Sequence, residues 1–397
     1  MKIWLCKHSE QIALNHTDRH FRFSLISKEL SYRNHEVIWW ASRFSHTTKT
    51  LLPVEIDRME NGTKLILLEG IKYSRNLSIK RVINHYQLGK NFNEKSRKVE
   101  KPELIYASVP TLDFAYKAVR YALKNRIPII IDILDLWPDV FKDLIPINGL
   151  KNNLIINYYE KKLLYILENA SAIIGITEGY LNWAESKLSN KEIVSKVFPL
   201  GFENLNNITI NINKNDRLRI IFAGTIGYHF DLETVLKAAS KLNFIDFEIV
   251  GDGDLFAKYK KAYDSYNNIH FHGWLEKKEL HSLLISSDLG IAPYNNSKNF
   301  TLNIPNKPFE YLAHGLPVIT CLKGETMKML NYSSSGYFYK ENNVNNLVDL
   351  IINISKNRDK LYQKSLSSIK IFNEKYNSDV IYPELCDFIE HIGGSCK

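Results

Sequence analysis

The sequence lacks the cysteine pairs that indicate disulfides or structural zinc. Its four cysteines, Cys6, Cys321, Cys386 and Cys396, lie far apart, and no two have the spacing of a zinc site or a redox dithiol. Twelve histidines occur, but none of their spacings suggests a metal site with a third ligand nearby. We therefore expect a reducing, cytoplasmic environment, no metal centre and no cofactor.

Long apolar runs are missing as well. No window reaches about 18 uninterrupted apolar residues, so no segment is predicted to cross a bilayer, and charge returns at Lys7, too soon for a signal peptide. There is no P-loop, no Gly-x-Ser-x-Gly nucleophile turn and no aromatic-basic RNA-binding motif, which argues against a nucleic-acid partner. Any membrane contact is predicted to be peripheral.

What the chain has is length, a globular composition and a basic excess. Hydrophobic residues make up 45% of the 397 residues, and Lys plus Arg outnumber Asp plus Glu by 52 to 43. This length predicts two domains of roughly 150 to 200 residues each. The positive balance favours anionic partners such as nucleotides or phospholipid headgroups.

Short apolar runs alternate with segments of helical period, which is typical of parallel α/β architecture. The first half predicts strands at residues 2–6, 36–42, 103–108, 128–134, 172–177 and 197–201, and helices at 18–34 and 112–126. The second half predicts strands at 218–227, 247–254, 268–274, 289–294 and 316–321, and helices at 231–242, 255–266, 276–286 and 305–314. Two parallel α/β units are therefore expected.

One polar passage sets the predicted domain boundaries. Residues 203–217 are rich in asparagine and interrupt the alternation, so we expect a linker between a domain at 1–202 and a domain at 218–375. The tail, residues 376–397, is expected to be helical and to pack back on the first domain. Because ligands of open α/β sheets bind beyond the carboxyl ends of the strands, the cleft between the two domains is the predicted site.

Segment 71–101 departs from this alternation. It holds nine Lys or Arg against two Glu. Apolar residues are interleaved with the charges: Ile71, Tyr73, Leu77, Ile79, Val82, Ile83 and Tyr86. Such a segment can lie in an anionic membrane interface, with Arg75, Lys80 and Arg81 as candidate contacts. The alternative is a solvated surface helix over the core.

Two glycine-containing turns follow predicted strands of the second half. Gly224 and Gly227 lie between a strand and a helix, where backbone N–H groups and the helix N-terminus suit a diphosphate. The alternative is that the turn needs glycine only for its geometry. In the next turn Asp252 and Asp254 form an Asp-x-Asp pattern, with which some sugar transferases hold a metal, but an ordinary tight turn is the stronger interpretation.

The stretch NIPNKPFEYLAHGLPVIT, residues 303–320, predicts a helix followed by a strand. Lys307 lies in the first turn, where a cation opposes the helix dipole, and Glu310 lies one turn on, on the same face. A phosphate would explain Lys307, and Glu310 could accept hydrogen bonds from the two hydroxyls of a ribose, worth roughly 1.5–3 kcal/mol each. The alternative is a surface ion pair that contributes at most about 1 kcal/mol.

Two carboxylates end an apolar strand in IDILDLWPDVF, residues 131–141. A carboxylate buried there is costly unless it is bonded or used, so Asp135 is a site candidate. Strand alternation points Asp132 to the other face, which indicates a structural role for that residue.

Together these motifs resemble glycosyltransferase family 4, a family of retaining enzymes with the GT-B fold. The resemblance runs over most of the chain, through the segments LSYRNHEVIWWAS, DLWPD, AGTIG, VGDG, HFHGW, SDLGIAPY and PNKPFEYLAHGLPVI, of which the last is the most specific. The DLWP and Gly-x-Ile-Gly segments, with WWASRFSH, are similar to the bacterial O-antigen and capsule branch, which includes N-acetyl-L-fucosamine transferases.

The resemblance implies a GT-B fold, two Rossmann-like domains facing across a cleft, and a role for each matching residue. Lys307 would hold the donor's diphosphate, Glu310 the ribose hydroxyls, and Asp135 matches the aspartate of the family's His-Asp or Arg-Asp pair; these three are the catalytic candidates. Further donor contacts are implied for Gly224, Thr225, Gly227, Asp252, Tyr294, Pro305 and Asn306. Arg19 and His20, in the segment that replaces the family's glycine-rich first loop, are implied acceptor contacts.

The sequence also departs from the family pattern. Leu302 stands where the first glutamate of the family's Glu-x7-Glu pair is expected, and Leu134 replaces the basic residue before Asp135. Tyr228 and His229 replace the common Arg and Lys after the phosphate turn. These differences leave the implied fold intact and weaken the assignment of a particular sugar.

The implied function is metal-independent hexosyl transfer with retention. The donor would be a nucleotide-sugar, UDP-linked and of the N-acetylhexosamine type, and the acceptor a lipid-linked saccharide of bacterial lipopolysaccharide O-antigen or capsule biosynthesis at the inner face of the cell membrane. One alternative is a sugar-nucleotide 2-epimerase of the same fold. Another, suggested by Leu134 and Leu302, is a non-catalytic protein that binds a nucleotide-sugar.

Overall fold

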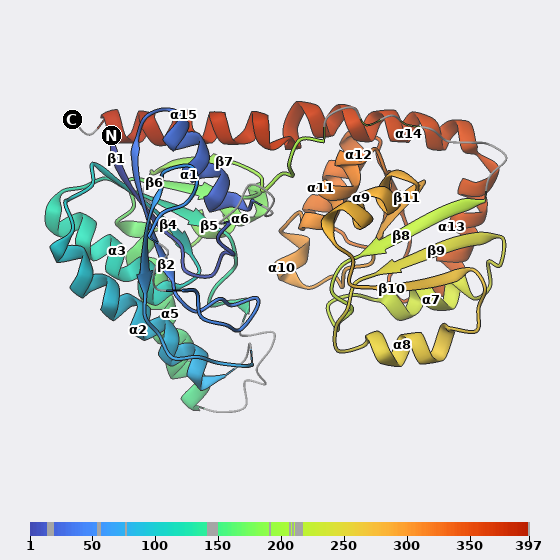
Figure 1. Ribbon diagram of the computed structural model, residues 1–397, viewed down its shortest axis with the longest axis horizontal. Coiled ribbons are helices and arrows are strands. Elements are labelled where there is room, and N and C mark those ends of the chain that lie inside the picture. Colours follow the sequence, from blue (N-terminus) through green and yellow to red (C-terminus); the bar gives the residue numbers. More distant parts are fainter. Residues whose placement is uncertain are drawn as a thin grey trace. The chain divides into compact units, whose positions relative to one another are not determined.

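The computed structural model describes residues 1–13, 20–53, 57–75, 78–140, 150–189, 192–205, 208, 210 and 217–395. The chain divides into two compact units (Figure 1). The first is Met1–Pro199 with Ile381–Lys397, and the second is Leu200–Val380. Each unit is a parallel α/β unit, so the predicted fold class is confirmed. Most of the predicted linker, residues 203–217, lies outside the described residues.

The first unit is built on a parallel sheet whose described part has seven strands in the order β3-β2-β1-β4-β5-β6-β7. The strands are β1 Lys2–Cys6, β2 Glu36–Ser42, β3 Lys64–Leu68, β4 Leu104–Val109, β5 Ile129–Ile133, β6 Ala172–Gly175 and β7 Val194–Val197. Ile3 of β1 lies opposite Val37 of β2 and Leu104 of β4. The strand order reverses between β1 and β4, which makes this the switch point of the sheet.

Helices cover both faces of this sheet, which is why its central strands are apolar almost throughout (Figure 1). The helices of the first unit are α1 Arg22–Tyr32, α2 Ile79–Lys95, α3 Leu112–Asn125, α5 Leu150–Glu168, α6 Glu178–Glu185 and α15 Ser378–Ser395. Ile3 packs in one core cluster with Phe23 of α1 and Ile389 of α15. The next residue, Trp4, points to the other face and lies 6.1 Å from Phe92 of α2, between ring centroids.

Two edges of the first sheet differ from the prediction. The strand expected at 197–201 lies instead at Val194–Val197, because Pro199 has no N–H to donate and Gly201 has a φ of 65°. The strand Lys64–Leu68 was not predicted. Each is an edge strand, where only one neighbour and partial burial leave a weak sequence pattern.

The second unit is built on a parallel sheet whose described part has six strands in the order β10-β9-β8-β11-β12-β13. The strands are β8 Leu218–Ala223, β9 Ile245–Val250, β10 Ile269–Gly273, β11 Leu289–Ala292, β12 Val318–Thr320 and β13 Gly336–Phe338. Its helices are α7 Leu232–Ala239, α8 Phe256–Tyr263, α9 Lys277–Ile285, α10 Lys298–Thr301, α11 Asn306–Ala313, α12 Glu325–Tyr332, α13 Val344–Lys356 and α14 Arg358–Ile371. Here the strand order reverses between β8 and β11.

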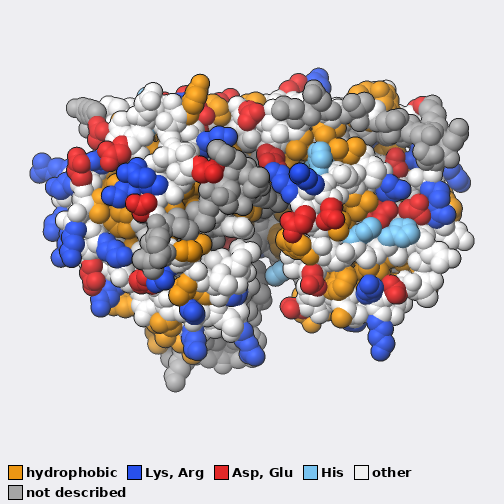
Figure 2. All heavy atoms as spheres, viewed as in Figure 1, with side chains coloured by type: hydrophobic (Ala, Val, Ile, Leu, Met, Phe, Trp, Pro, Cys, Tyr) orange, Lys and Arg blue, Asp and Glu red, His pale blue; other side chains and the backbone are white. Residues whose placement is uncertain are grey.

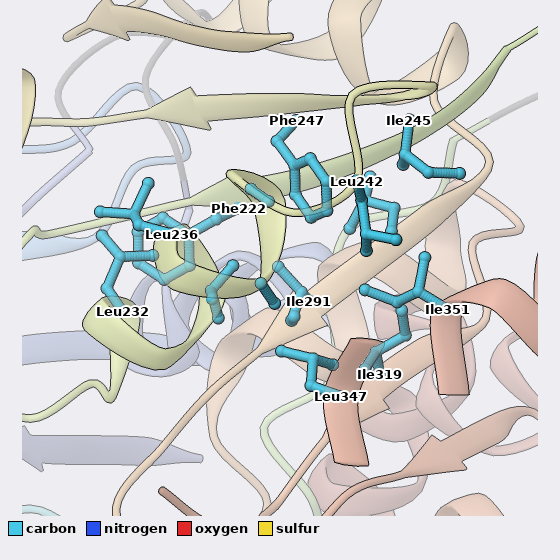
Figure 3. Close-up of a cluster of buried hydrophobic side chains, with 14 of the residues drawn as sticks. Phe222, Leu232, Leu236, Leu242, Ile245, Phe247, Ile291, Ile319, Leu347 and Ile351 are labelled. Atoms are coloured by element: carbon cyan, nitrogen blue, oxygen red, sulfur yellow. The ribbon is translucent and has the colours of Figure 1, made fainter. Parts of the chain in front are cut away.

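The core of the second unit fixes the strands on which the candidate site depends. Phe222 of β8 and Ile291 of β11 pack with Leu236 of α7 and Leu347 of α13 (Figure 3). Each fully buried side chain of this size stabilises the fold by roughly 1.5–3 kcal/mol. On the opposite face, Phe309 of α11 lies in a second cluster with residues of β8 and β11. The start of α11 is thereby held beside the switch point.

The lengths and polarity of the helices bear on membrane crossing. Within the described ranges, each helix is too short or too polar to cross a bilayer.

Candidate functional site

The candidate site lies at the switch point of the second sheet, where α11 begins. The Tyr311 hydroxyl of α11 accepts a hydrogen bond from the Ala223 N–H of β8 at 3.0 Å and donates to the Ile291 carbonyl of β11 at 3.3 Å. A side chain on Gly290 would overlap the Tyr311 ring, so glycine at that position lets α11 approach the sheet closely. The N-terminus of α11 is therefore fixed over the gap between β8 and β11.

Lys307, in the first turn of α11, is 8% exposed and points inward. Its ammonium group donates to the Ala223 carbonyl and lies over the rings of Phe222 and Phe230, 4.8 and 5.1 Å from their centroids. Contact with these ring faces and the carbonyl offsets the unfavourable position in the helix dipole. The structure does not show the surface ion pair with Glu310 that was the alternative interpretation.

Gly224 makes room for this ammonium group. Its φ is 150°, and a side chain there would overlap the end of Lys307. A side chain on Gly251 would likewise overlap the Gly224 carbonyl, and one on Gly253 would collide with the Ile226 backbone. The two turns after β8 and β9 therefore pack backbone against backbone. Glycine is needed here for geometry, and the same geometry positions the lysine.

The rest of the predicted phosphate turn is open to solvent. Thr225 is exposed, and a side chain added to Gly227 would meet nothing closer than the Thr225 methyl group, at 4.0 Å. Tyr228 is 72% exposed, and the His229 ring lies 6.0 Å from that of Phe300. The turn can therefore receive a ligand group without rearranging the core.

The Asp-x-Asp segment forms a tight turn. The Asp252 carboxylate is exposed and accepts the Gly253 N–H at 2.7 Å, and the Asp252 carbonyl accepts the Ile226 N–H at 2.9 Å. Asp254 does not cap the next helix, because Leu255 occupies the N-cap of α8. In the part of the chain that the structure describes, no three His, Cys, Asp or Glu side chains are grouped so as to hold a metal ion.

Glu310 is half-buried one turn along α11. Among the described residues, nothing forms a hydrogen bond or ion pair with its carboxylate, so this group is available to a ligand. The Glu310 carbonyl accepts from Nδ1 of His314 at 2.7 Å, and Nε2 of His314 lies 3.0 Å from Nδ1 of His281. Burial lowers the pKa of His314 to about 4, so the ring is neutral and Nε2 accepts from His281.

Three further predicted donor contacts surround the start of α11. Tyr294 is buried against Phe230, 4.6 Å between centroids, and its hydroxyl accepts the backbone N–H of Lys307. Burial raises the pKa of Tyr294. Pro305 is the buried N-cap of α11, and Asn306 is exposed beside it. Tyr294 thus braces the backbone of the residue that carries the ammonium group.

The other predicted site residues lie in the first unit. Asp135 follows β5 and is half-buried; its carboxylate accepts the Leu136 N–H at 2.9 Å and a hydrogen bond from the Trp137 side chain. Burial raises the pKa of Asp135, and the nearby charges of Lys7 and Arg81 oppose that rise. His20 bonds Ser24 at 2.8 Å through Nδ1.

Asp132 has the structural role that strand alternation indicated. It accepts from Arg22 at 2.7 Å and from the Tyr106 hydroxyl at 2.8 Å, all three buried. Lys80 is exposed in the first turn of α2, Arg75 is exposed ahead of that helix, and Arg19 lies outside the described residues.

The structure thus brings together Lys307, Gly224 and Tyr294, with Glu310 one turn away. Sequence reasoning missed the residues that hold Lys307, namely Phe222, Phe230, Tyr311 and the Ala223 carbonyl. An apolar strand end leaves no signal that distinguishes a ring packed under a lysine from an ordinary core ring. In the first unit, sequence reasoning also missed Lys7 and His8. Their position just after the strand β1 could have indicated them, because ligands of such sheets bind beyond the carboxyl ends of the strands.

The chain is similar to known proteins in sequence and in fold. Residues 205–368 match the model of the family described as "Glycosyl transferases group 1". The amylovoran biosynthesis glycosyltransferase AmsK of Erwinia amylovora is 21% identical over 151 residues, which are 37% of this chain and 37% of that protein. The chain therefore matches little more than a third of the length of that relative.

Solved structures match over nearly the whole chain. Anabaena Alr3699/HepE in complex with UDP has a TM-score of 0.66 at 12% identity, covering 98% of this chain and 100% of its own. WaaG, a glycosyltransferase involved in lipopolysaccharide biosynthesis, has a TM-score of 0.64 at 12% identity, covering 98% and 99%. At these identities the likeness shows the fold, which is that of the GT-B glycosyltransferases.

Proposed function

We propose that the protein is a retaining glycosyltransferase that transfers a hexosyl group, of the N-acetylhexosamine type, from a UDP-sugar to a lipid-linked saccharide. The observation that carries the proposal is the Lys307 ammonium group, held against the Gly224 turn at the switch point of the second sheet. The match of residues 205–368 to a glycosyltransferase family and the fold shared with HepE, whose structures contain UDP and UDP-glucose, support it.

The second unit would bind the nucleotide part of the donor. The Lys307 ammonium group and the N-terminus of α11 would stabilise the diphosphate as negative charge develops on it, with the backbone N–H groups of Thr225 and Gly227 as further donors. Glu310, which lacks a partner among the described residues, would accept hydrogen bonds from the ribose hydroxyls. Asp252 at the neighbouring turn would complete the donor contacts.

The transfer itself needs no covalent enzyme intermediate. The acceptor hydroxyl oxygen bonds to the anomeric carbon on the face from which UDP departs, the carbon–oxygen bond to the diphosphate breaks with its electron pair passing to UDP, and the hydroxyl proton passes to a diphosphate oxygen. Lys307 offsets the resulting charge, so no metal ion or cofactor is required in this scheme. Asp135 would be the catalytic carboxylate of the first unit.

The acceptor would be presented at a membrane. Helix α2 turns an apolar stripe to solvent, with Ile79 80% and Tyr86 57% exposed and Val82 and Ile83 between them. Arg75 and Lys80 are exposed beside this stripe. Figure 2 shows hydrophobic and basic side chains next to one another on the lower part of the first unit. An amphipathic helix of this kind lies in the surface of an anionic bilayer, here the inner face of the cell membrane.

Thermal unfolding of the full chain with a panel of UDP- and GDP-sugars tests the donor assignment, because a ligand that binds the native state raises Tm. We expect a UDP-N-acetylhexosamine to give the largest shift. With that donor and a lipid-linked saccharide from a bacterial membrane extract, the product should retain the anomeric configuration, which NMR reports. Two outcomes would overturn the transfer reaction. One is consumption of the donor in the absence of acceptor, as by a 2-epimerase, and the other is binding of the donor without turnover.

Flotation with liposomes tests the membrane contact separately. The chain should float with vesicles that contain anionic lipid and not with neutral vesicles, and Ile79→Ser should weaken binding. Leu366→Ser, at a 43% exposed leucine of α14, is the matched control. Equal flotation with both lipids, or an equal loss in the two variants, would contradict the predicted surface.

A further inference from the structure

A group of imidazoles in the first unit has no part in the transfer scheme. We call His8, His46, Tyr73, Arg81 and His85 the histidine cluster. His8 directly follows β1 at the switch point of the first sheet, His46 follows β2, and Arg81 and His85 lie on α2. Tyr73 lies between β3 and α2, so side chains from four separate segments converge beside the carboxyl ends of β1 and β2.

Contacts within the histidine cluster are close. The rings of His8 and His85 are 5.1 Å apart between centroids, and Nδ1 of His46 lies 2.7 Å from the Tyr73 hydroxyl, which also bonds Arg81. Both Arg81 and His85 contact Trp137. The Arg81 guanidinium lies 5.2 Å from the centroid of the Trp137 ring, and the centroid of the His85 ring lies 5.5 Å from it. Trp137 forms one wall of the group.

Three ring nitrogens of His8 and His85 are buried without a partner among the described residues. His8 is 5% exposed, and neither of its ring nitrogens forms a hydrogen bond with any described residue; the same holds for Nε2 of His85, which is 2% exposed. Buried polar atoms are normally paired, so unpaired nitrogens on two adjacent rings indicate a ligand that supplies the partner. His46 and Arg81 are half-buried, which leaves the group open to solvent on that side.

The charges around the imidazoles are mainly positive. Lys7, Lys49 and Arg81 face the group, with Asp135 and Glu10 as the nearby carboxylates. Burial, and then the neighbouring cations, lower the pKa of His46 to about 4 and that of His85 to about 3. The rings are thus neutral at pH 7, and each can take up a proton when an anion arrives.

We infer that the histidine cluster binds an anionic group of the acceptor, a phosphate or a carboxylate, with Arg81 as its charged contact and the imidazoles of His8 and His85 as its buried donors. This inference rests on the proposed function, because it names the chemistry of the molecule that receives the sugar.

Proton uptake should accompany binding. A bound anion raises the pKa of the facing imidazoles, so they become protonated at a pH where the free rings are neutral, and affinity rises as pH falls from 8 to 6. A site made only of arginine and lysine would show little change over this range. This dependence distinguishes the histidine cluster from a general basic surface.

NMR of the full chain labelled at histidine Cε1 tests the inference directly. Methyl phosphate and glucuronic acid are the anionic probes, methyl glucoside the uncharged one, and single His→Asn variants assign the resonances. At pH 7 we expect an anion to move the His8 and His85 resonances toward their protonated positions and methyl glucoside to leave them unchanged. A response to methyl phosphate alone would identify a phosphate-bearing acceptor, and one to glucuronic acid alone an acidic saccharide.

Arg81→Gln should weaken binding of the effective probe at least tenfold, while Arg120→Gln, at an exposed arginine of α3, should not. If Arg81→Gln does not fold, His85→Gln is measured in its place. No shift with either anion, or equal weakening in the Arg81 and Arg120 variants, would overturn the anion site. If the shifts occur and UDP-sugar transfer fails, the anion site stands and the proposed reaction does not.

Discussion

The two units share the same strand order around their switch points and fill those points in different ways. In the second unit, glycine turns after β8 and β9 pack backbone on backbone and leave one ammonium group, that of Lys307, at the edge of the sheet. In the first unit, the edge carries side chains, with Lys7 and His8 after β1 and Asp135 after β5. One topology thus places glycine turns and a single lysine at the switch point of one unit, and several polar side chains at that of the other.

The units also differ in how a helix is tied to the sheet. In the second unit the neutral hydroxyl of Tyr311 joins α11 to β8 and β11. In the first unit a buried ion pair, Arg22 of α1 with Asp132 of β5, does this, and Arg22 also donates to the carbonyls of Phe198 and Pro199 at 3.0 Å. We therefore expect the stability of the first unit to respond most to the loss of a buried charge, and that of the second unit to respond most to changes in side-chain size.

The largest effect on stability is expected from breaking the buried ion pair between Arg22 and Asp132. Asp132→Ala leaves the Arg22 guanidinium buried without its counter-ion, which should lower the free energy of unfolding by about 3–5 kcal/mol. Urea denaturation followed by circular dichroism measures this. Tyr106→Phe, which removes only a hydroxyl that donates to Asp132, should cost about 1 kcal/mol. Similar losses in the two variants would show that the charge is not what matters.

The next effect concerns activity in the second unit. Lys307→Met keeps an unbranched apolar stem between Phe222 and Phe230 and removes the charge. We expect kcat/KM for sugar transfer to fall by about 10²–10³, since removing one preorganised donor to a developing anion costs that much. Lys261→Met, at an exposed lysine of α8, is the control. Near-normal turnover in Lys307→Met would refute the role of this residue in holding the diphosphate.

A smaller effect on stability and UDP binding is expected to differ between Gly224 and Gly227, two glycines of one turn. Gly224→Ala places a methyl group where the Lys307 ammonium lies and forces alanine to a φ of 150°, so we expect a loss of about 1–3 kcal/mol of stability and weaker UDP binding. Gly227→Ala has open space and should affect both quantities less. Thermal unfolding and calorimetric titration with UDP measure the two. The reverse order would contradict the backbone packing described for this turn.

Much of the fold could be predicted because parallel strands covered on both faces are continuous apolar runs. Most of the central strands were placed within a few residues on this basis, for example Lys2–Cys6 and Glu36–Ser42. The edge strands were harder to predict: β3 and β13 were not predicted and β7 was misplaced, because such strands are short or half-exposed and end without a clear turn signal. The helices α12 to α14 were not predicted either.

The candidate site could be predicted only where one segment carries it. Lys307 and Glu310 lie on one helix, so their spacing was visible in the sequence. The acceptor of the Lys307 ammonium group is a backbone carbonyl 84 residues earlier, and a carbonyl leaves no trace in the residue types. The histidine cluster was missed for a related reason, because positions 8, 46 and 85 follow no period, and only tertiary packing brings them together.

The smallest expected effect is a pH dependence that separates the units. Glu10, in the first unit, accepts the N–H groups of Phe23 and Ser24 at the start of α1, and burial raises its pKa from 4.5 to about 7. Between pH 4.5 and 7 the folded chain therefore holds a proton that the unfolded chain has released, and this contribution to stability falls as pH rises. His314, in the second unit, acts in the opposite direction, because its lowered pKa makes stability rise with pH between about 4 and 6.5.

Glu10→Gln should remove the first contribution, which we expect to be on the order of 1–2 kcal/mol because the two N–H groups favour the charged carboxylate and offset part of the burial effect. Unfolding free energies measured from pH 4 to 8 give the difference curve between wild type and variant. It should decline across pH 4.5–7, whereas Glu94→Gln, at an exposed glutamate of α2, should give a flat one. A difference curve that rises over this window would mean that the hydrogen bonds at the helix N-terminus outweigh burial.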